Sequence, residues 1–270
     1  MSGTLLDGRK LSTEIRAELQ QRVTALAVRG VAPTMMGFLV GEDPASAGYV
    51  QLKERGASQI GLKAEMCHLP VDCSQLDLSQ RLIEASDNPC VHGIFVQLPL
   101  PAHIDQNAVL ALIAPEKDID GFHPMNVGRS WLGQQSFVPA TPAGIVEMLE
   151  RTGHTDLRNR HAVILSTDDL VGKPTAALML QRYGANVTLL HADSPDVSHW
   201  TRLADILVVS VNRPHFVAAD MVKEGVIAID FGANYVDDSS APGGRRLVGD
   251  IDFETVRSKA TAITPVPGGL

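Results

Sequence analysis

Three sets of polar side chains in the first half of the sequence have types and spacings that suit chemistry on a small molecule. Tyr49 and Lys53 lie four positions apart in a segment with helical spacing, so they project from one face of that helix. Gln97 ends an apolar segment, and Asp118 and Asp120 stand just before a glycine. A lysine amine can move a proton, while amides and carboxylates can accept hydrogen bonds. The set therefore suggests an acid–base site for a polar ligand.

Each of these signals also has a structural interpretation. Tyr49 and Lys53 could belong to the solvated face of an amphipathic helix, which their spacing alone favours. Gln97 could cap the end of a strand, and the two aspartates could stabilise a turn, since aspartate favours turns. Taken singly, none of the residues decides between a functional and a structural role.

The elements that must position these side chains alternate between strands and helices. After a helix over 9–29, apolar and amphipathic segments predict strand 33–40, helix 46–60, strand 64–69, helix 75–87, strand 92–98 and helix 106–113. This order predicts a parallel sheet with helices on its faces. Gln97 would then point toward the crevice at the carboxyl ends of the strands, where such sheets bind ligands.

The second half of the sequence predicts another sheet of the same kind. A turn-rich segment over 118–142 precedes a helix over 143–152. A second helix opens at Lys173-Pro174 and ends at Gly184, and strands are expected at 161–165, 186–191, 205–211 and 226–232. The fold class is therefore α/β, with two α/β domains of which the second is Rossmann-like with a parallel sheet. We place the first domain at 1–120, the connection at 121–145 and the second domain at 146–270.

Composition restricts the class of protein. The chain has 270 residues and a net charge of −8, which argues against a nucleic-acid partner. No apolar stretch approaches the roughly 18 residues of a membrane span, and the N-terminus lacks the basic and apolar regions of a secretory signal. The three cysteines and nine histidines show no metal-ligand spacing. We therefore expect a cytoplasmic protein with no metal site and no membrane or nucleic-acid partner.

The order and spacing of several short motifs are those of one enzyme family. The motifs in the first half are Gly41–Ser46, Tyr49 with Lys53, Val96–Pro101, Lys117–Gly121, Asn126 with Gly128, and Pro139–Gly144. With them the chain resembles, over nearly its whole length, the bifunctional methylenetetrahydrofolate dehydrogenase/methenyltetrahydrofolate cyclohydrolase family. The matches in the second half are Asp230–Asn234, Gly249–Asp252 and Thr264–Gly269.

The resemblance implies a role for each polar residue of the first half. Lys53 would be the central catalytic residue, Gln97 would hold it, Tyr49 would stack along the folate and Asp120 would bind the pterin edge. The substrate passes through a cationic methenyl form, and a positive charge beside a desolvated lysine favours the neutral amine. A neutral amine can assist water attack or proton transfer at the one-carbon centre.

The second half departs from the family at the cofactor site. The family has Gly-Arg-Ser after the first strand of this domain, and the aligned residues here are Ser166, Thr167 and Asp168. The arginine is expected to pair with the 2′-phosphate of NADP, as a guanidinium does well. Thr167 cannot do this, and Asp168 would repel a phosphate unless it points away. Val171, Gly172 and Pro174 of the same loop do match the family.

Two further departures concern the same cofactor. The family's His-Ser is His191-Ala192 here, followed by Asp193, which could accept from ribose hydroxyls as in NAD-binding proteins. Asn212 replaces a glycine, and asparagine tolerates positive φ better than most residues. We expect NADP as cofactor, with NAD possible because of these departures, or a mere scaffold if dinucleotide binding is lost. The expected contacts come from Ser166, Thr167, Asp168, Gly172, His191, Ala192, Asp193, Asn212 and Ala233.

The motif Thr264–Gly269 implies that Pro265, Gly268 and Gly269 bind substrate. The family continues from there into a last helix expected to line the folate site, whereas this sequence stops at Leu270. Either the chain is truncated, or it continues beyond the residues of the sequence.

The leading hypothesis is a bifunctional enzyme of one-carbon metabolism. It would oxidise 5,10-methylenetetrahydrofolate with NAD(P)⁺ and hydrolyse the methenyl product to 10-formyltetrahydrofolate. The alternatives are a cyclohydrolase without dehydrogenase activity, a non-catalytic folate-binding relative, and a Rossmann dehydrogenase for another substrate. An intact Lys53 argues against the second alternative, and the lack of Gly-x-Gly-x-x-Gly argues against the third. We expect tetrahydrofolate derivatives as ligands and a homodimer formed through the nucleotide domain.

Overall fold

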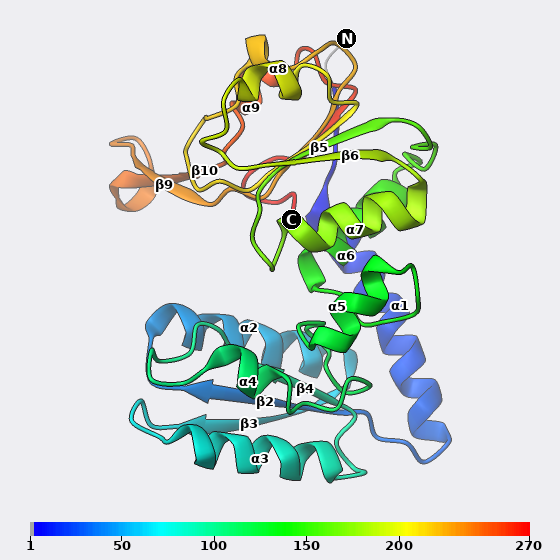
Figure 1. Cartoon of the computed structure of the whole chain (residues 1–270), viewed down its shortest axis with the longest axis vertical. Coiled ribbons are helices and arrows are strands. Elements are labelled where there is room, and N and C mark those ends of the chain that lie inside the picture. The colour runs from blue at the N-terminus through cyan, green and yellow to red at the C-terminus, as the bar shows by residue number, and fades with distance from the viewer. Residues whose placement is uncertain (1–2) are drawn as a thin grey trace. The chain divides into compact units, whose positions relative to one another are not determined.

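The computed structural model describes residues 3–270, which form two compact units (Figure 1). One unit comprises 13–129 and 135–138. The other comprises the segment that ends at Ser12, together with 130–134 and 139–270. The chain therefore passes from one unit to the other near Ser12 as well as in the region after Arg129.

The first unit is built on a three-stranded parallel sheet, which confirms the parallel α/β arrangement expected for this half. Its strands are β2 (Thr34–Val40), β3 (Lys63–Leu69) and β4 (Gly93–Val96), in the order β3-β2-β4. Its helices are α1 (Gly8–Val28), whose first turn belongs to the other unit, α2 (Pro44–Ile60), α3 (Gln75–Asp87), α4 (Gln106–Leu110) and α5 (Pro124–Trp131). Figure 1 shows α2 on one face of the sheet and α3 on the other.

The side chains of β4 alternate between two cores. Ile94 and Val96 are buried in the cluster that contains Leu78 of α3, whereas Phe95 is buried with Val50 of α2. Gln97 follows the strand in phase with Phe95, because side chains two positions apart share one face of a strand. The alternation therefore directs Gln97 toward the face that α2 covers.

The second unit contains a six-stranded parallel sheet in the order β1-β11-β8-β7-β5-β6. Its strands are β1 (Thr4–Leu5), β5 (His161–Leu165), β6 (Asn186–Leu190), β7 (Ile206–Val209), β8 (Ile227–Asp230) and β11 (Ala262–Ile263). Between β8 and β11 the chain forms an antiparallel hairpin of β9 (Asn234–Asp237) and β10 (Arg245–Val248). The strand order reverses at β5, which has β6 on one side and β7 on the other.

The helices that the sequence predicts for the second unit begin earlier in the chain than expected. They are α6 (Ala140–Arg151), α7 (Gly172–Tyr183), α8 (Val197–Thr201) and α9 (Phe253–Val256), with 3-10 turns at Ala219–Met221 and Pro242–Gly244. The segment 118–142 was expected to be turns, yet α5 forms within it and α6 starts three residues before the expected 143. Pro124 and Pro139 stand at the starts of these helices, where proline is tolerated because no intrahelical N–H is needed.

Across 3–270, no helix has the length and apolar character needed to cross a membrane.

Candidate active site

Helix α2 presents Tyr49 and Lys53 in adjacent turns, as their spacing predicts. The helix begins where the Asp43 side chain accepts a hydrogen bond from the Ser46 backbone N–H at 2.8 Å, with Pro44 in the first turn. Val50, the neighbour of Tyr49, is 1% exposed in the core, whereas Tyr49 itself is 62% exposed. The tyrosine ring is therefore open to contact with a ligand.

The Lys53 amine contacts two side chains that reach it from other segments of the first unit. Nζ lies 3.2 Å from Oδ2 and 3.4 Å from Oδ1 of Asp120, in the turn before α5. It also lies 3.9 Å from the centre of the Phe95 ring on β4. An ammonium over an aromatic face is attracted by the ring's negative potential. The position of the amine is thus fixed by a carboxylate and by an aromatic face.

Asp120 is the more buried member of this ion pair. Its side chain is 20% exposed and that of Lys53 is 37% exposed. Burial raises the pKa of Asp120, and the Lys53 ammonium counteracts this shift. The Lys53 ammonium therefore offsets part of the cost of ionising this buried carboxyl group.

Asp118 has a structural role, in agreement with the turn interpretation. It is 2% exposed and closes the turn that carries Asp120. Its carboxylate accepts hydrogen bonds from the backbone N–H groups of Gly121, Phe122 and His123 and from the side-chain amide of Asn126. The two aspartates of this motif thus differ: the first holds the loop, and the second faces the lysine.

Gln97 does not make the hydrogen bond to Lys53 that the sequence analysis expects. Its Nε2 donates to Leu98 O at 2.9 Å, and its Oε1 is buried without a hydrogen-bond partner among residues 3–270. The lysine pairs with Asp120 instead, since an ionised carboxylate attracts an ammonium more strongly than a neutral amide does. A buried acceptor without a partner is costly, so Oε1 is available to a donor that enters the site.

The second unit brings the expected cofactor residues to one edge of its sheet. Leu165 at the end of β5 pairs in register with Leu190 of β6 and with Val209 of β7. The loops that follow these strands therefore leave from the same carboxyl edge, at the strand-order reversal where such sheets bind ligands. The expected residues on these loops are Ser166, Thr167, Asp168, His191, Ala192, Asp193 and Asn212.

Asp168 is directed into its own loop. Its Oδ1 accepts from Leu170 N at 2.8 Å and from Val171 N at 2.6 Å, and its Oδ2 accepts from the Ser166 hydroxyl. These bonds compensate the negative charge that was expected to repel a phosphate. At the start of α7, a Cβ on Gly172 would lie 2.0 Å from Ser166 O, so only glycine fits there.

Two side-chain contacts join loops at this edge. Thr167 Oγ1 lies 2.8 Å from His191 Nδ1, which links the loops after β5 and β6. Arg213 Nη2 lies 2.5 Å from Asp193 Oδ1, which links the loops after β7 and β6. Asn212 has a φ of 55°, in the region that asparagine tolerates well.

Buried aspartates hold the loops at this edge in place. Asp250 is fully buried, and it accepts hydrogen bonds from the backbone N–H groups of Val211, Asn212 and Arg213. Asp230 is 4% exposed and accepts from the backbone of Gly232, Asp250 and Ile251. Burial raises the pKa of Asp230 to about 6. Ala233, an expected cofactor contact, is exposed in the turn that follows β8.

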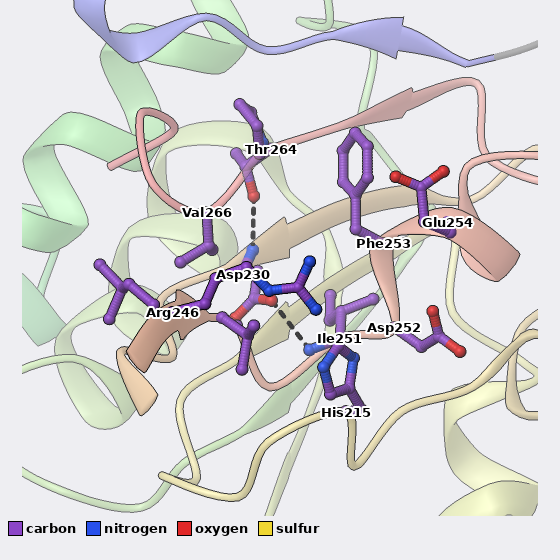
Figure 2. A pocket seen from close by; sticks show the side chains of 13 residues that line it. His215, Asp230, Arg246, Ile251, Asp252, Phe253, Glu254, Thr264 and Val266 are labelled. Atoms are coloured by element: carbon purple, nitrogen blue, oxygen red, sulfur yellow. Dashed lines mark hydrogen bonds between the residues drawn. The ribbon is translucent and has the colours of Figure 1, made fainter. Parts of the chain in front are cut away.

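Asp230 also borders a cavity of about 290 Å³ within the second unit. Figure 2 shows the Thr264 hydroxyl accepting from the Asp230 N–H, while the Asp230 carboxylate accepts from Ile251 N. Pro265 lines the same cavity, whereas Gly268 and Gly269 contact the start of α1: Gly8 N donates to Gly268 O at 3.0 Å. The role of Pro265, Gly268 and Gly269 in substrate binding stays a prediction.

Comparison with known proteins assigns both halves of the chain. Residues 6–120 match the catalytic domain of tetrahydrofolate dehydrogenase/cyclohydrolase, and residues 139–270 match its NAD(P)-binding domain. The chain belongs to the tetrahydrofolate dehydrogenase/cyclohydrolase family. The resemblance found in the sequence motifs is thereby confirmed.

Individual members of the tetrahydrofolate dehydrogenase/cyclohydrolase family are similar along nearly the whole chain. The bifunctional protein FolD of Chloroherpeton thalassium is 45% identical over 98% of this chain and 92% of its own length. The crystal structure of bifunctional FolD from Campylobacter jejuni is 40% identical, with a TM-score of 0.93 over 99% of this chain and 93% of that one. The Trypanosoma brucei FolD, complexed with NADP and an inhibitor, is 35% identical, with a TM-score of 0.92 over 100% and 92%.

The second unit of this family member fits a nicotinamide dinucleotide. Its crevice edge carries the polar groups of Thr167 and His191 and the guanidinium of Arg213, and Gly172 allows the close turn before α7. These groups suit the hydroxyls and phosphates of such a ligand. In the described part of the chain, no group of three or more His, Cys, Asp or Glu side chains could hold a metal ion.

Four residues that contribute to these sites were not predicted from the sequence. Phe95 looks like any core residue of an apolar strand, and only its phase with Gln97 could have pointed to the lysine. Arg213 was read only as part of a loop in which Asn212 replaces a glycine. The buried Asp230 and Asp250 were noted only as parts of family motifs, although an aspartate beside a glycine after an apolar strand could have indicated a loop anchor.

Proposed function

We propose that this chain oxidises 5,10-methylenetetrahydrofolate to 5,10-methenyltetrahydrofolate with NADP⁺ and then hydrolyses the product to 10-formyltetrahydrofolate. The observation that carries the proposal is the position of the Lys53 amine between Asp120 and Phe95, on the face toward which Gln97 is directed. The motifs around this lysine belong to a family whose members are named for both activities.

Each residue of the site takes a role that its environment supports. The exposed ring of Tyr49 stacks along the substrate, and Asp120 accepts hydrogen bonds from the amino and ring N–H donors of the pterin. Lys53 transfers protons at the one-carbon centre. Gln97 Oε1, which lacks a partner, accepts from the lysine amine or from a bound water once a substrate competes for Asp120.

The hydrolysis needs a proton acceptor beside the methenyl carbon. Water adds to this carbon, and a C–O bond forms as a proton leaves the oxygen for the neutral Lys53 amine. The bond between the carbon and N5 then breaks, so that the formyl group stays on N10. Of the two protons that leave the water oxygen, one ends on N5 and the other is released to solvent. Desolvation beside a cationic substrate favours the neutral amine that this step uses.

The dehydrogenation precedes this step and produces its cationic substrate. When bound, a nicotinamide would supply the acceptor for the hydride of the methylene carbon. The residues of this chain that would hold the dinucleotide are those at the carboxyl edge of the second sheet: Ser166, Thr167, Asp168, Gly172, His191, Ala192, Asp193, Asn212 and Ala233. We favour NADP over NAD because an arginine, Arg213, lies at this edge although the family's Gly-Arg-Ser is absent.

We further propose the setting in which the enzyme acts. The folate-binding catalytic domain spans 1–120, although residues 3–12 pack with the second unit. A connection spans 121–145, and the NAD(P)-binding domain spans 146–270. The protein acts in the cytoplasm as a homodimer that forms through the nucleotide domain. The division into two domains is supported by the family matches over 6–120 and 139–270, and light scattering of the purified protein tests the dimer.

A product analysis tests the two activities together. The purified chain receives methylenetetrahydrofolate and NADP⁺, and chromatography follows 10-formyltetrahydrofolate while absorbance follows NADPH. The proposal predicts both products above a control with no enzyme. Hydrolysis of supplied methenyltetrahydrofolate without any oxidation would indicate a cyclohydrolase alone, and folate binding without turnover of either substrate would indicate a non-catalytic relative.

A further inference from the structure

We propose that Arg213 and Asp193 are the residues that distinguish a 2′-phosphate from a 2′-hydroxyl on the adenosine ribose of the cofactor. Arg213 binds a 2′-phosphate, and Asp193 accepts from a 2′-hydroxyl. The inference rests on the proposed function, because it takes the second unit to bind a dinucleotide. It assigns the choice between NADP and NAD to two residues that the sequence motifs of the family do not contain.

The topology of the sheet places this pair at the crevice. Arg213 lies on the loop after β7 and Asp193 on the loop after β6, and β5 runs between those two strands. The Arg213 side chain therefore reaches past the end of β5 to meet Asp193, with Nη2 and Oδ1 2.5 Å apart. In sheets of this type, the residue after the second strand of the nucleotide fold meets the adenosine ribose. The guanidinium thus stands where the 2′ substituent would lie.

The loop after β5 carries no arginine that could bind a 2′-phosphate through two parallel hydrogen bonds. Within 166–173 the charged residues are Asp168, Asp169 and Lys173. Asp168 is bound within its own loop, and Lys173 belongs to the first turn of α7, where its amine lies 2.5 Å from Asp169. Arg213 is the arginine in the loops after β5, β6 and β7, so it can take the place of the arginine missing from the Gly-Arg-Ser position.

The backbone presents Arg213 from a fixed loop. The buried Asp250 carboxylate accepts from Arg213 N at 2.8 Å and also binds the two preceding N–H groups. The guanidinium carbon lies 5.4 Å from the centre of the Phe216 ring, which further restricts the side chain. A cation held in this way loses less freedom when it binds an anion than one on a mobile loop does.

The existing ion pair is weak enough for a phosphate to displace Asp193. The side chain of Arg213 is 44% exposed and that of Asp193 is 79% exposed, so solvent screens their attraction. A phosphate monoester carries more charge than a carboxylate and binds a guanidinium through two parallel hydrogen bonds. A ribose hydroxyl cannot compete for Arg213, but it can donate to the Asp193 carboxylate. The pair can therefore bind a ribose with a 2′-phosphate or one with a 2′-hydroxyl, and the charges of Arg213 and Asp193 set the relative affinity for the two.

Binding of two nucleotide fragments tests the assignment without relying on catalysis. Titration calorimetry compares adenosine 2′,5′-bisphosphate with AMP on the full chain, and full-length NADP and NAD serve as reference ligands. For the wild type we expect tighter binding of the bisphosphate. Arg213→Gln should weaken the bisphosphate roughly 10- to 100-fold and leave AMP within about twofold. Asp193→Asn should tighten the bisphosphate and weaken AMP, each by a few-fold.

Matched variants separate this role from damage to the fold. Arg213→Lys should restore part of the affinity for the bisphosphate, because the charge remains. Arg245→Gln removes another exposed, ion-paired arginine, on the hairpin of the same unit, and should change neither ligand. Equal bisphosphate affinity in wild type and Arg213→Gln would overturn the role of Arg213 and leave the dinucleotide-binding function intact. If the wild type bound neither NADP nor NAD, the proposed dinucleotide-binding function would be overturned, and the assignment of Arg213 and Asp193 with it.

Discussion

The amine of Lys53 lies 3.9 Å from the centre of the Phe95 ring, on the α2 side of the first sheet. This contact depends on the alternation of β4, which turns Phe95 and then Gln97 toward α2 while Ile94 and Val96 face the opposite core. Asp120 completes the arrangement at 3.2 Å from the amine. The lysine is thus held by a helix, a strand and a turn that are far apart in the sequence.

Replacement of the central lysine should separate catalysis from folding. We expect Lys53→Met to reduce hydrolysis of methenyltetrahydrofolate by about 10²- to 10⁴-fold, the range typical of a lost acid–base group. Circular dichroism should show an intact fold, since the lysine side chain is partly exposed. Lys63→Met, at an exposed lysine paired with Glu65 on β3, serves as the matched control. Near-normal hydrolysis by Lys53→Met would refute the mechanism.

Substitution of Asp118 should affect mainly stability, whereas substitution of Asp120 should affect mainly folate binding. Asp118→Ala leaves buried N–H donors without a partner, so we expect the free energy of unfolding to fall by about 3 kcal/mol. Asp120→Ala removes a partly exposed ion pair, so the loss of stability should stay below about 1 kcal/mol. Folate affinity should nevertheless drop roughly 10- to 100-fold in Asp120→Ala. Urea denaturation and fluorescence titration measure the two quantities, and unchanged folate affinity in Asp120→Ala contradicts its assigned role.

Gln97 offers a test of whether a polar group is kept for function. Its Oε1 is buried without a partner, so Gln97→Met should cost little stability or even add some. The same change should lower kcat for hydrolysis by at least about tenfold, because the lysine or its water loses an acceptor. Thermal denaturation and steady-state kinetics check the two effects. A variant that is clearly less stable but equally active would show that Gln97 serves the fold alone.

Asp230 should give the folded protein a distinct dependence on pH. Its pKa is raised by burial from 3.8 to about 6, so between these values the folded chain retains a proton that the unfolded chain releases. This contribution to stability is fully present below pH 3.8 and is lost as the pH rises through 6. The free energy of unfolding should therefore decrease by up to about 3 kcal/mol across this window on account of Asp230.

The variant Asp230→Asn isolates this contribution. The difference in unfolding free energy between wild type and Asp230→Asn should decrease from pH 4 to pH 7, whatever the absolute cost of the substitution. Urea denaturation at four pH values in this range measures it. Asp237→Asn, at a side chain that is 95% exposed, serves as the matched control. Parallel curves for wild type and Asp230→Asn would show that the carboxyl titrates alike in both states.

The sequence predicts the elements well and the contacts between them poorly. Hydrophobic periodicity locates β2, β3 and β5 to within a residue or two, because local side-chain alternation determines them. It does not predict that Thr4–Leu5 pairs with β11, since that pairing joins the two ends of the chain. The partner of Lys53 was expected to be Gln97 and is Asp120, because the choice depends on how the turn after Asp118 folds back. The Arg213–Asp193 contact likewise follows from the strand order, which no local pattern encodes.

The proposed enzyme activity is tested most directly by measuring how much methenyltetrahydrofolate forms, through its absorbance after an acid quench. The purified chain receives methylenetetrahydrofolate with NADP⁺ in one cuvette and with NAD⁺ in another. We expect turnover, with NADP⁺ preferred if Arg213 reads the 2′-phosphate. A faster reaction with NAD⁺ would keep the dehydrogenase and contradict the cofactor assignment. No turnover with either cofactor would contradict the bifunctional enzyme.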